Sequence, residues 1–283
     1  MGARSLPFRI MKSTASFLRG TLLAVGFMAG AALSGAGISS GAASRPDKMI
    51  LIPAGIYAPF SLGPQDAKQE AVAAFLLDDY PVTNGEFLTF LRANPKWQRS
   101  QISRLFADSS YLKNWNADLE PGPLAPLDSP VVHVSWFAAR AYAHWAGKHL
   151  PTTAEWELAA GAGYTRPDGN NDPAFVRDLY AWFALPVPNV LPAITTSRAN
   201  YYGVHGLHGL VWEWVDDFNS AIISSLDPNL LCAAGATDVK DTGDYAAFMR
   251  RALRSSLQAN NTTSALGFRC ARDPKVSTTA SLP

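Results

Sequence analysis

Short apolar runs separated by long polar stretches predict a loop-rich domain of short strands and helices. The apolar run over 49–57 ends at proline and glycine, which is typical of a strand, and residues 72–77 predict a second strand. No hydrophobic period persists over 95–130 or over 161–200, where Pro, Gly, Asp and Asn are frequent. We therefore expect an irregular fold with long connecting loops and not a helical bundle.

Three helices are predicted from their N-terminal capping residues. Thr83 followed by Glu86 forms one capping box, and Thr152 followed by Glu155 forms another. Ser135 precedes a stretch in which apolar residues recur at helical spacing, so it is predicted to cap a helix there. These signals predict helices that begin just after 83, 135 and 152.

The first 43 residues are typical of a secretory signal peptide. They contain four basic side chains and no acidic one, then an apolar stretch over 20–33 and small residues up to Ala43. We expect cleavage near Ala43, with Ala36 as a second site, and the alternative is an uncleaved anchor, although the stretch is short for a membrane span. There is no twin arginine and no cysteine at the cleavage region. The expected organisation is a signal peptide over 1–43, one domain over 44–273 and a flexible tail over 274–283. We expect a periplasmic protein with no stable membrane insertion after cleavage.

The charge balance argues against a nucleic-acid partner. The whole chain has a formal net charge of +1 at pH 7, and loss of the four basic residues of the leader would change this to −3. The remaining sequence has no basic run that could follow a phosphate backbone. We therefore expect no nucleic acid among its ligands.

The chain has only two cysteines, Cys232 and Cys270. In an oxidising compartment two such residues most simply form one disulfide, which here would close a loop of about 38 residues and stabilise the fold by about 3–4 kcal/mol. The alternative is a redox or metal-binding thiol pair, but these roles usually require closer spacing. The sequence predicts a structural disulfide.

A glycine-rich turn leads into Trp212-Glu213-Trp214. Glycine tolerates positive φ, so the turn can present backbone carbonyls at close quarters. Glu213 adds a carboxylate beside them, and this combination of oxygens suits a hard cation such as calcium. The alternative is a buried aromatic strand whose glutamate accepts a hydrogen bond from a backbone amide.

Four segments that occur in a fixed order carry a resemblance to a known family. They are Pro81–Phe87, Pro130–Trp136 continuing through Ala143–Glu157, Gly206–Trp214, and Leu266–Ala271. Together they resemble the formylglycine-generating enzyme, or sulfatase-modifying factor, family over residues 49–273. The resemblance implies an irregular α+β domain related to C-type lectins, which agrees with the loop-rich pattern.

The resemblance also implies what this chain lacks. Family members that oxidise a substrate cysteine hold a copper ion with two cysteines upstream of the Gly-Phe-Arg motif. Counting back without gaps from Leu266, these positions fall on Asp241 and Ala246. Asp and Ala cannot supply the soft thiolates that Cu(I) requires. We therefore expect no copper and no formylglycine generation.

The family's calcium site is only partly present. Its glutamate corresponds to Glu213, and its backbone ligands correspond to Gly209 and Val211. The family's asparagine ligand is replaced by Gly206. Because water can complete a calcium coordination sphere, a structural calcium ion remains an expectation of the resemblance.

Exported, single-domain family members without the copper cysteines include proteins that mature the siderophore pyoverdine. The resemblance therefore implies a tailoring oxidoreductase that converts dihydropyoverdine to pyoverdine, with a small aromatic or peptide siderophore precursor as substrate. The oxidant is unknown, since the sequence has no Gly-rich dinucleotide or phosphate motif. The alternatives are an accessory maturation factor for another periplasmic enzyme and a non-catalytic, lectin-like binding module.

Candidate site residues follow from this interpretation. Asp241 and Tyr245 lie on the segment that replaces the copper loop, and Arg254 keeps the position of a family arginine. A carboxylate could take a phenolic proton while an arginine holds the developing oxyanion. Three tryptophans are the predicted walls for an aromatic substrate: Trp136, Trp212 and Trp214. The alternative is an acidic surface loop with Arg254 in a structural ion pair.

Overall fold

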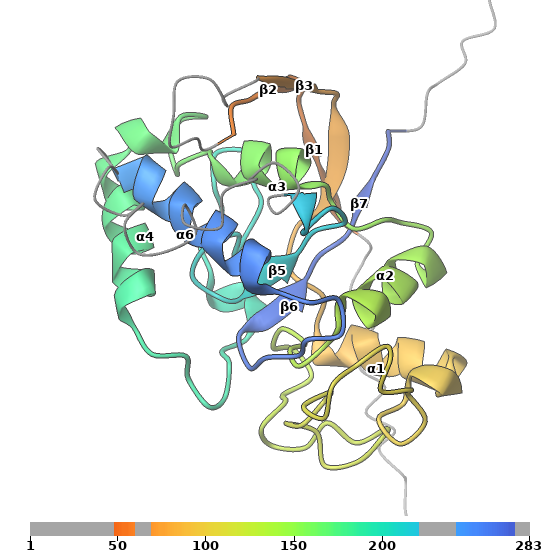
Figure 1. Cartoon of the computed structure of the whole chain (residues 1–283). Coiled ribbons are helices and arrows are strands. Elements are labelled where there is room, and N and C mark those ends of the chain that lie inside the picture. Colours follow the sequence, from red (N-terminus) through yellow and green to blue (C-terminus); the bar gives the residue numbers. More distant parts are fainter. Residues whose placement is uncertain (1–47, 60–68, 221–241, 275–283) are drawn as a thin grey trace, which may run out of the picture. The chain divides into compact units, whose positions relative to one another are not determined.

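The computed structural model describes residues 48–59, 69–220 and 242–274, all within one compact unit that spans Ala42–Pro283. Its strands form three small sheets (Figure 1). The first has the antiparallel order β1 (Met49–Ile52), β4 (Phe75–Asp78), β7 (Ala271–Arg272). In the second, β2 (Gly55–Tyr57) pairs with β3 (Glu70–Val72). The third joins β5 (Trp212–Trp214) to β6 (Leu266–Phe268) in parallel. Helices and sheets are mixed, so the predicted α+β class is confirmed.

The three predicted helix starts are confirmed. Thr83 caps α1 (Asn84–Ala93) and Thr152 caps α3 (Thr153–Ala160), each in a complete capping box with a glutamate. Ser135 caps α2 (Trp136–Trp145), where its side chain accepts from the backbone N–H of Ala138. These local bonds satisfy backbone donors that a helix start leaves free, which is why the signals could be found without tertiary information.

The stretch 161–200, expected to be mostly loop, contains an α-helix that was not predicted. Asp172 caps α4 (Pro173–Ala184), and Pro173 occupies its first position, where a missing N–H removes no helical bond. Phe175 and Leu179 lie four residues apart and are buried together. The single strand predicted over 72–77 is two strands, because the chain turns between β3 and β4.

The remaining described elements are one helix and three short 3-10 turns. Helix α6 (Thr242–Ser256) runs beside α4 and across β5 (Figure 1). The 3-10 turns cover Pro95–Trp97, Gly169–Asn171 and Ile194–Thr196. Within the described part of the chain, no helix is both long enough and apolar enough to cross a membrane.

An aromatic cluster holds α1 and α2 against β6. The ring of Phe87 lies 5.9 Å from that of Tyr142 and 6.2 Å from that of Phe268, and Phe90 lies 5.6 Å from Tyr142. The parallel β5–β6 pair passes beside this cluster. Burial of several large rings at such distances supplies much of the hydrophobic stabilisation of this region.

Gly267 allows β6 to pass close to the loop before α2. A Cβ atom at Gly267 would lie 2.5 Å from the carbonyl oxygen of Val131, which is backbone and cannot rotate away. We expect Gly267→Ala to lower the free energy of unfolding by about 2–3 kcal/mol through overpacking. Urea denaturation followed by tryptophan fluorescence measures this change.

Gly147 provides the control for that prediction. It has a φ of +68° and no atom within 4 Å of its would-be Cβ. Gly147→Ala should therefore cost only the left-handed strain, about 1 kcal/mol. Equal destabilisation by both substitutions would show that the close approach to Val131 is not what requires glycine at 267.

Candidate functional site

Glu213 lies at the centre of a buried charge network on β5. Its Oε1 accepts from Nη2 of Arg269 at 2.8 Å, and its Oε2 accepts from Nε of Arg269 at 2.8 Å and from Nε1 of Trp156 at 2.7 Å. Both charged side chains have an exposed fraction of 0%. A carboxylate and a guanidinium bonded at two points form one of the strongest charge-assisted pairs in proteins.

Arg269 extends this network to the backbone. Its Nη1 donates to the carbonyl oxygens of Asp78 and Asp79 at 3.1 and 3.3 Å, and its Nη2 donates to that of His205 at 2.9 Å. One guanidinium therefore connects β5, the end of β4 and the turn before β5. Its donors are used almost entirely inside the fold, so the pair is structural.

The contacts of Glu213 do not leave a place for a calcium ion. Both carboxylate oxygens already accept from Arg269, and a divalent cation at the same oxygens would have to displace that guanidinium. The predicted ligand set of Glu213, Gly209 and Val211 therefore does not fit calcium in this arrangement. The calcium site stays a prediction.

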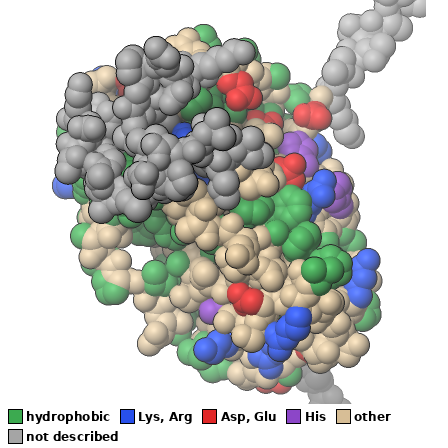
Figure 2. All heavy atoms as spheres, viewed as in Figure 1, with side chains coloured by type: hydrophobic (Ala, Val, Ile, Leu, Met, Phe, Trp, Pro, Cys, Tyr) green, Lys and Arg blue, Asp and Glu red, His purple; other side chains and the backbone are tan. Residues whose placement is uncertain are grey.

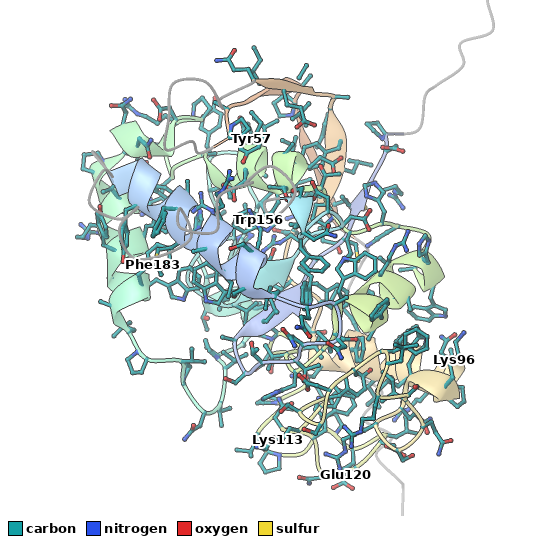
Figure 3. All side chains as sticks on the ribbon, viewed as in Figure 1. Tyr57, Lys96, Lys113, Glu120, Trp156 and Phe183 are labelled. Atoms are coloured by element: carbon teal, nitrogen blue, oxygen red, sulfur yellow. The ribbon has the colours of Figure 1, made fainter. Side chains whose placement is uncertain are left out.

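Glu157 on α3 anchors α6 through two arginines. The preceding residue, Trp156, is labelled in Figure 3. Arg250 donates to both oxygens of Glu157 at 2.7–3.0 Å, and Nη1 of Arg254 donates to Oε1 at 2.6 Å. Burial raises the Glu157 pKa, but the two guanidinium charges and their hydrogen bonds outweigh it and hold the pKa at about 2. The guanidinium carbons of Arg250 and Arg254 also lie 5.7 and 5.2 Å from the ring centroid of Trp156.

The predicted catalytic residues are not brought together among the described residues. Arg254 is buried in its ion pair with Glu157. This agrees with the alternative in which Arg254 forms a structural ion pair. Tyr245 lies nine residues earlier on α6, about 13 Å along the axis. Its ring centroid is 6.1 Å from those of Phe183 and Tyr180 on α4. Asp241 lies outside the described residues, so the assignment of a catalytic set stays a prediction.

The three predicted tryptophans occupy different environments. Trp212 is half-buried, with its ring centroid 5.0 Å from that of Trp182 and 5.6 Å from that of Phe183. Trp214 is buried and donates to the carbonyl oxygen of Val134 at 2.9 Å. Trp136, at the start of α2, donates to the carbonyl oxygen of Val215. Trp212 and Trp214 line one cavity beneath α6, and Trp136 is not among its lining residues.

That cavity is small. It has about 10 Å³ of free space and is lined on one side by Trp156, Trp182 and Trp212 and on the other by Arg250 and Arg254. This volume holds about one water molecule and no aromatic ring. A substrate can reach these tryptophans only if α6 separates from α3.

Cys270 is buried next to a charged pair, and no cysteine among the described residues bonds to it. Its backbone N–H donates to Oδ2 of Asp78 at 2.9 Å, and the other oxygen of Asp78 pairs with Lys148 at 2.7 Å. Burial, followed by the negative charge of Asp78, raises the pKa of the thiol well above its usual value. Cys232 lies outside the described residues, so its pairing with Cys270 stays a prediction.

A second, larger cavity of about 480 Å³ lies elsewhere, and the sequence reasoning missed it. Its lining includes Lys113, Asn114 and His133. These residues come from irregular segments, and a cavity between loops leaves no periodic signal in the sequence. His133 lies two residues before the predicted capping residue Ser135, so the sequence there indicates the approach to a helix and no cavity.

Comparison with known proteins identifies the class to which the chain belongs. The model of the sulfatase-modifying factor enzyme 1-like domain matches residues 36–274, and the chain belongs to this family. It is thus homologous to formylglycine-generating enzymes. The bovine (Bos taurus) formylglycine-generating enzyme is 29% identical over 290 residues, which covers 83% of this chain and 77% of that protein.

Two further relatives show the same extent of similarity. The formylglycine-generating enzyme of Thermomonospora curvata is 30% identical, covering 72% of this chain and 83% of its own. The inactive C-alpha-formylglycine-generating enzyme 2 of Bos taurus is 31% identical, covering 74% of this chain and 80% of its own.

Among solved structures, PvdO from Pseudomonas aeruginosa has a TM-score of 0.46 at 20% identity, covering 80% of this chain and 94% of its own. CarF has a TM-score of 0.48 at 17% identity, covering 81% and 99%.

The Glu157 network predicts a specific pH dependence of stability. The pKa of Glu157 is about 2 in the folded protein and 4.5 when the side chain is free. The stabilisation that its ion pairs give to the fold is therefore present above pH 4.5 and is lost as pH falls towards 2. This contribution is about 3 kcal/mol. Glu157→Gln should lower the unfolding free energy at pH 7 and flatten its dependence between pH 5 and 2, measured by urea denaturation at each pH.

Asp216 supplies the control. It pairs with Arg140 at 3.4 Å, and both side chains are nearly half exposed. Asp216→Asn should change stability by less than about 0.5 kcal/mol. An acid transition of Glu157→Gln that superimposes on that of the unmodified protein would contradict the assignment.

The Arg269 contacts also predict how the protein responds to calcium. Because the guanidinium occupies both oxygens of Glu213, we expect the same melting temperature in calcium and in chelator. A ligand that binds the native state would raise it, since binding adds RT ln(1 + [L]/Kd) to stability. A calcium-dependent rise that disappears in Glu213→Ala would establish the calcium site instead.

Proposed function

We propose that this protein is an exported sulfatase-modifying-factor-like protein that tailors a siderophore precursor in the periplasm. The proposed reaction is the oxidation of the dihydropyoverdine chromophore to pyoverdine. This removes two electrons and two protons from the chromophore, and no motif of the sequence identifies the electron acceptor. The proposal rests on family membership together with the sequence resemblance to exported members that lack the copper cysteines.

The observation that carries the proposal is the environment of Ala246. This residue stands where the resemblance places a copper-binding cysteine, and it is 2% exposed in an apolar cluster with Phe175 and Leu179. An apolar contact between α6 and α4 offers no soft ligand for copper. A family domain with this packing supports chemistry other than formylglycine generation.

The groups around α6 support an aromatic, anionic substrate. The ring centroids of Trp182, Phe183 and Trp212 lie 5.0–5.6 Å from one another, and Trp182 and Trp212 line the cavity beneath α6 together with Arg250 and Arg254. In the proposed binding mode α6 separates from α3, so that these aromatic faces stack on a flat chromophore and a released guanidinium stabilises a phenolate oxygen. In the proposed reaction the carboxylate of Asp241 takes the phenolic proton, with Tyr245 as a second catalytic group on the same segment.

A non-catalytic binding module is the second candidate. Arg254 is engaged by Glu157, and Tyr245 packs against Phe183, so neither residue is presented to a substrate in the described arrangement. This observation favours recognition without turnover. A deletion experiment separates the two candidates.

Deletion of the gene should leave an incompletely oxidised siderophore precursor in the periplasm while assembly of its peptide continues. Liquid chromatography with mass spectrometry measures the mass difference of two hydrogens between precursor and product. Complementation with Asp241→Asn or Tyr245→Phe should fail, and Tyr201→Phe, at an exposed tyrosine, should restore the product. A deletion strain that makes normal fluorescent siderophore would contradict the proposal and favour the binding module or an accessory maturation factor.

A further inference from the structure

A third cavity, of about 200 Å³, lies between α4, the residues just after α3 and the segment that leads from α4 to β5 (Figure 1). Sites for drug-sized molecules measure roughly 300–1,000 Å³, so this volume suits a smaller ligand. The cavity shares Leu207 with the one beneath α6, and no residue of α6 lines it. We call it the Arg198 cavity.

One tyrosine ring holds two opposite charges at the Arg198 cavity. The guanidinium carbon of Arg198 lies 3.9 Å from the ring centroid of Tyr164, and the hydroxyl of the same ring donates to Oδ2 of Asp178 at 3.2 Å. All three side chains line the cavity. No ion pair joins Arg198 to Asp178 in the described part of the chain, so the two charges lie near each other without neutralising each other.

Both charged groups can accept a further partner. Arg198 is exposed, and no carboxylate of the described residues pairs with it. Asp178 pairs through Oδ1 with Arg177, a neighbour that is 72% exposed and lies outside the cavity lining. Each carboxylate oxygen accepts about two hydrogen bonds, so Oδ2 has room for a donor besides Tyr164. An exposed ion pair such as that of Arg177 is weak, and a ligand can compete with it.

The other titratable side chains of the lining are neutral. Burial, followed by the positive charge of Arg250, lowers the pKa of His208 to about 3, and its Nε2 donates to the carbonyl oxygen of Ala160 at 3.0 Å. Burial, followed by the charge of Asp178, raises the pKa of Tyr164, so its hydroxyl keeps its proton. The described lining therefore presents one cation and one carboxylate at neutral pH.

The surface around the described residues does not favour one sign of charge. Figure 2 shows positive and negative side chains interspersed with hydrophobic ones, without one large patch of a single charge on the part that is coloured by type. Selection of a charged ligand on such a surface depends on local pairs of groups and not on a long-range field.

The wall of the Arg198 cavity is apolar. Four of its lining side chains are each less than a tenth exposed: Phe175, Leu179, Leu207 and Leu210. Contact with such a wall removes an aliphatic group from water, which is favourable in proportion to the area buried. A small cavity with two opposite charges and an apolar wall fits a small zwitterion that has an aliphatic side chain.

We propose that the Arg198 cavity binds a free aliphatic α-amino acid. The carboxylate of the ligand pairs with Arg198, its ammonium group donates to Asp178, and its side chain lies against Leu179 and Leu207. One carbon separates the amine of an amino acid from its carboxylate, so one molecule can bridge two charges held by a single ring through charge-assisted hydrogen bonds. This site goes beyond the proposed function, because it requires no oxidation and no residue of α6.

L-leucine is a suitable probe, with L-leucinamide as the analogue without the carboxylate and 4-methylpentanoate as the analogue without the amine. We expect L-leucine to bind the purified protein more tightly than either analogue in calorimetry or NMR titration. Arg198→Gln should weaken L-leucine about tenfold and leave L-leucinamide unchanged. Asp178→Asn should weaken L-leucine by a similar factor and leave 4-methylpentanoate unchanged.

Arg177→Gln is the matched control, because Arg177 contacts the same carboxylate from outside the lining. It should bind L-leucine at least as tightly as the unmodified protein, since one competitor for Asp178 is removed. Absence of L-leucine binding, equal affinity for the three probes, or equal weakening by the two arginine substitutions would overturn the proposal.

Discussion

The buried pair of Glu213 and Arg269 is the interaction on which the rest of the molecule depends. It joins two residues 56 positions apart, and its guanidinium also bonds the backbone at the end of β4 and before β5. Taking two charges out of water is unfavourable, and only near-complete hydrogen bonding offsets it. Removal of either partner would leave an uncompensated charge where the sheets and α3 meet.

A second ion pair places α6 on this centre. Glu157 on α3 holds two arginines one turn apart, so the segment in which the resemblance places the copper ligands contains a helix packed on α3 and α4. The same packing buries an alanine where the resemblance places a thiolate. The chain thus has the family fold, while the predicted copper position at Ala246 is an apolar contact; fold membership alone does not fix the chemistry, because function resides in local sites.

Local signals in the sequence could be read correctly and distant ones could not. The caps at Thr83, Ser135 and Thr152 act within one helical turn and were confirmed. Helix α4 was missed although Asp172-Pro173 marks its start, because the proline- and aspartate-rich surroundings favoured a loop. For Glu213 the sequence leaves a cation ligand and a buried structural role open, since nothing near it in sequence indicates that its partner is Arg269. The left-handed backbone at His133 is imposed by the loops that form hydrogen bonds with it, and no residue type at this position predicts it.

The strand order has a consequence for how the chain is made. Strand β4 lies between β1 and β7, so this sheet closes only when segments from both ends of the domain are present, and β5 must wait for the later strand β6. A growing chain that lacks residues 266–272 has neither the arginine at 269 nor the partner of β5. Non-local closure of this kind is slow, because the loop entropy is lost before the contacts form. The described core is therefore completed only after the last strands of the domain have been synthesised.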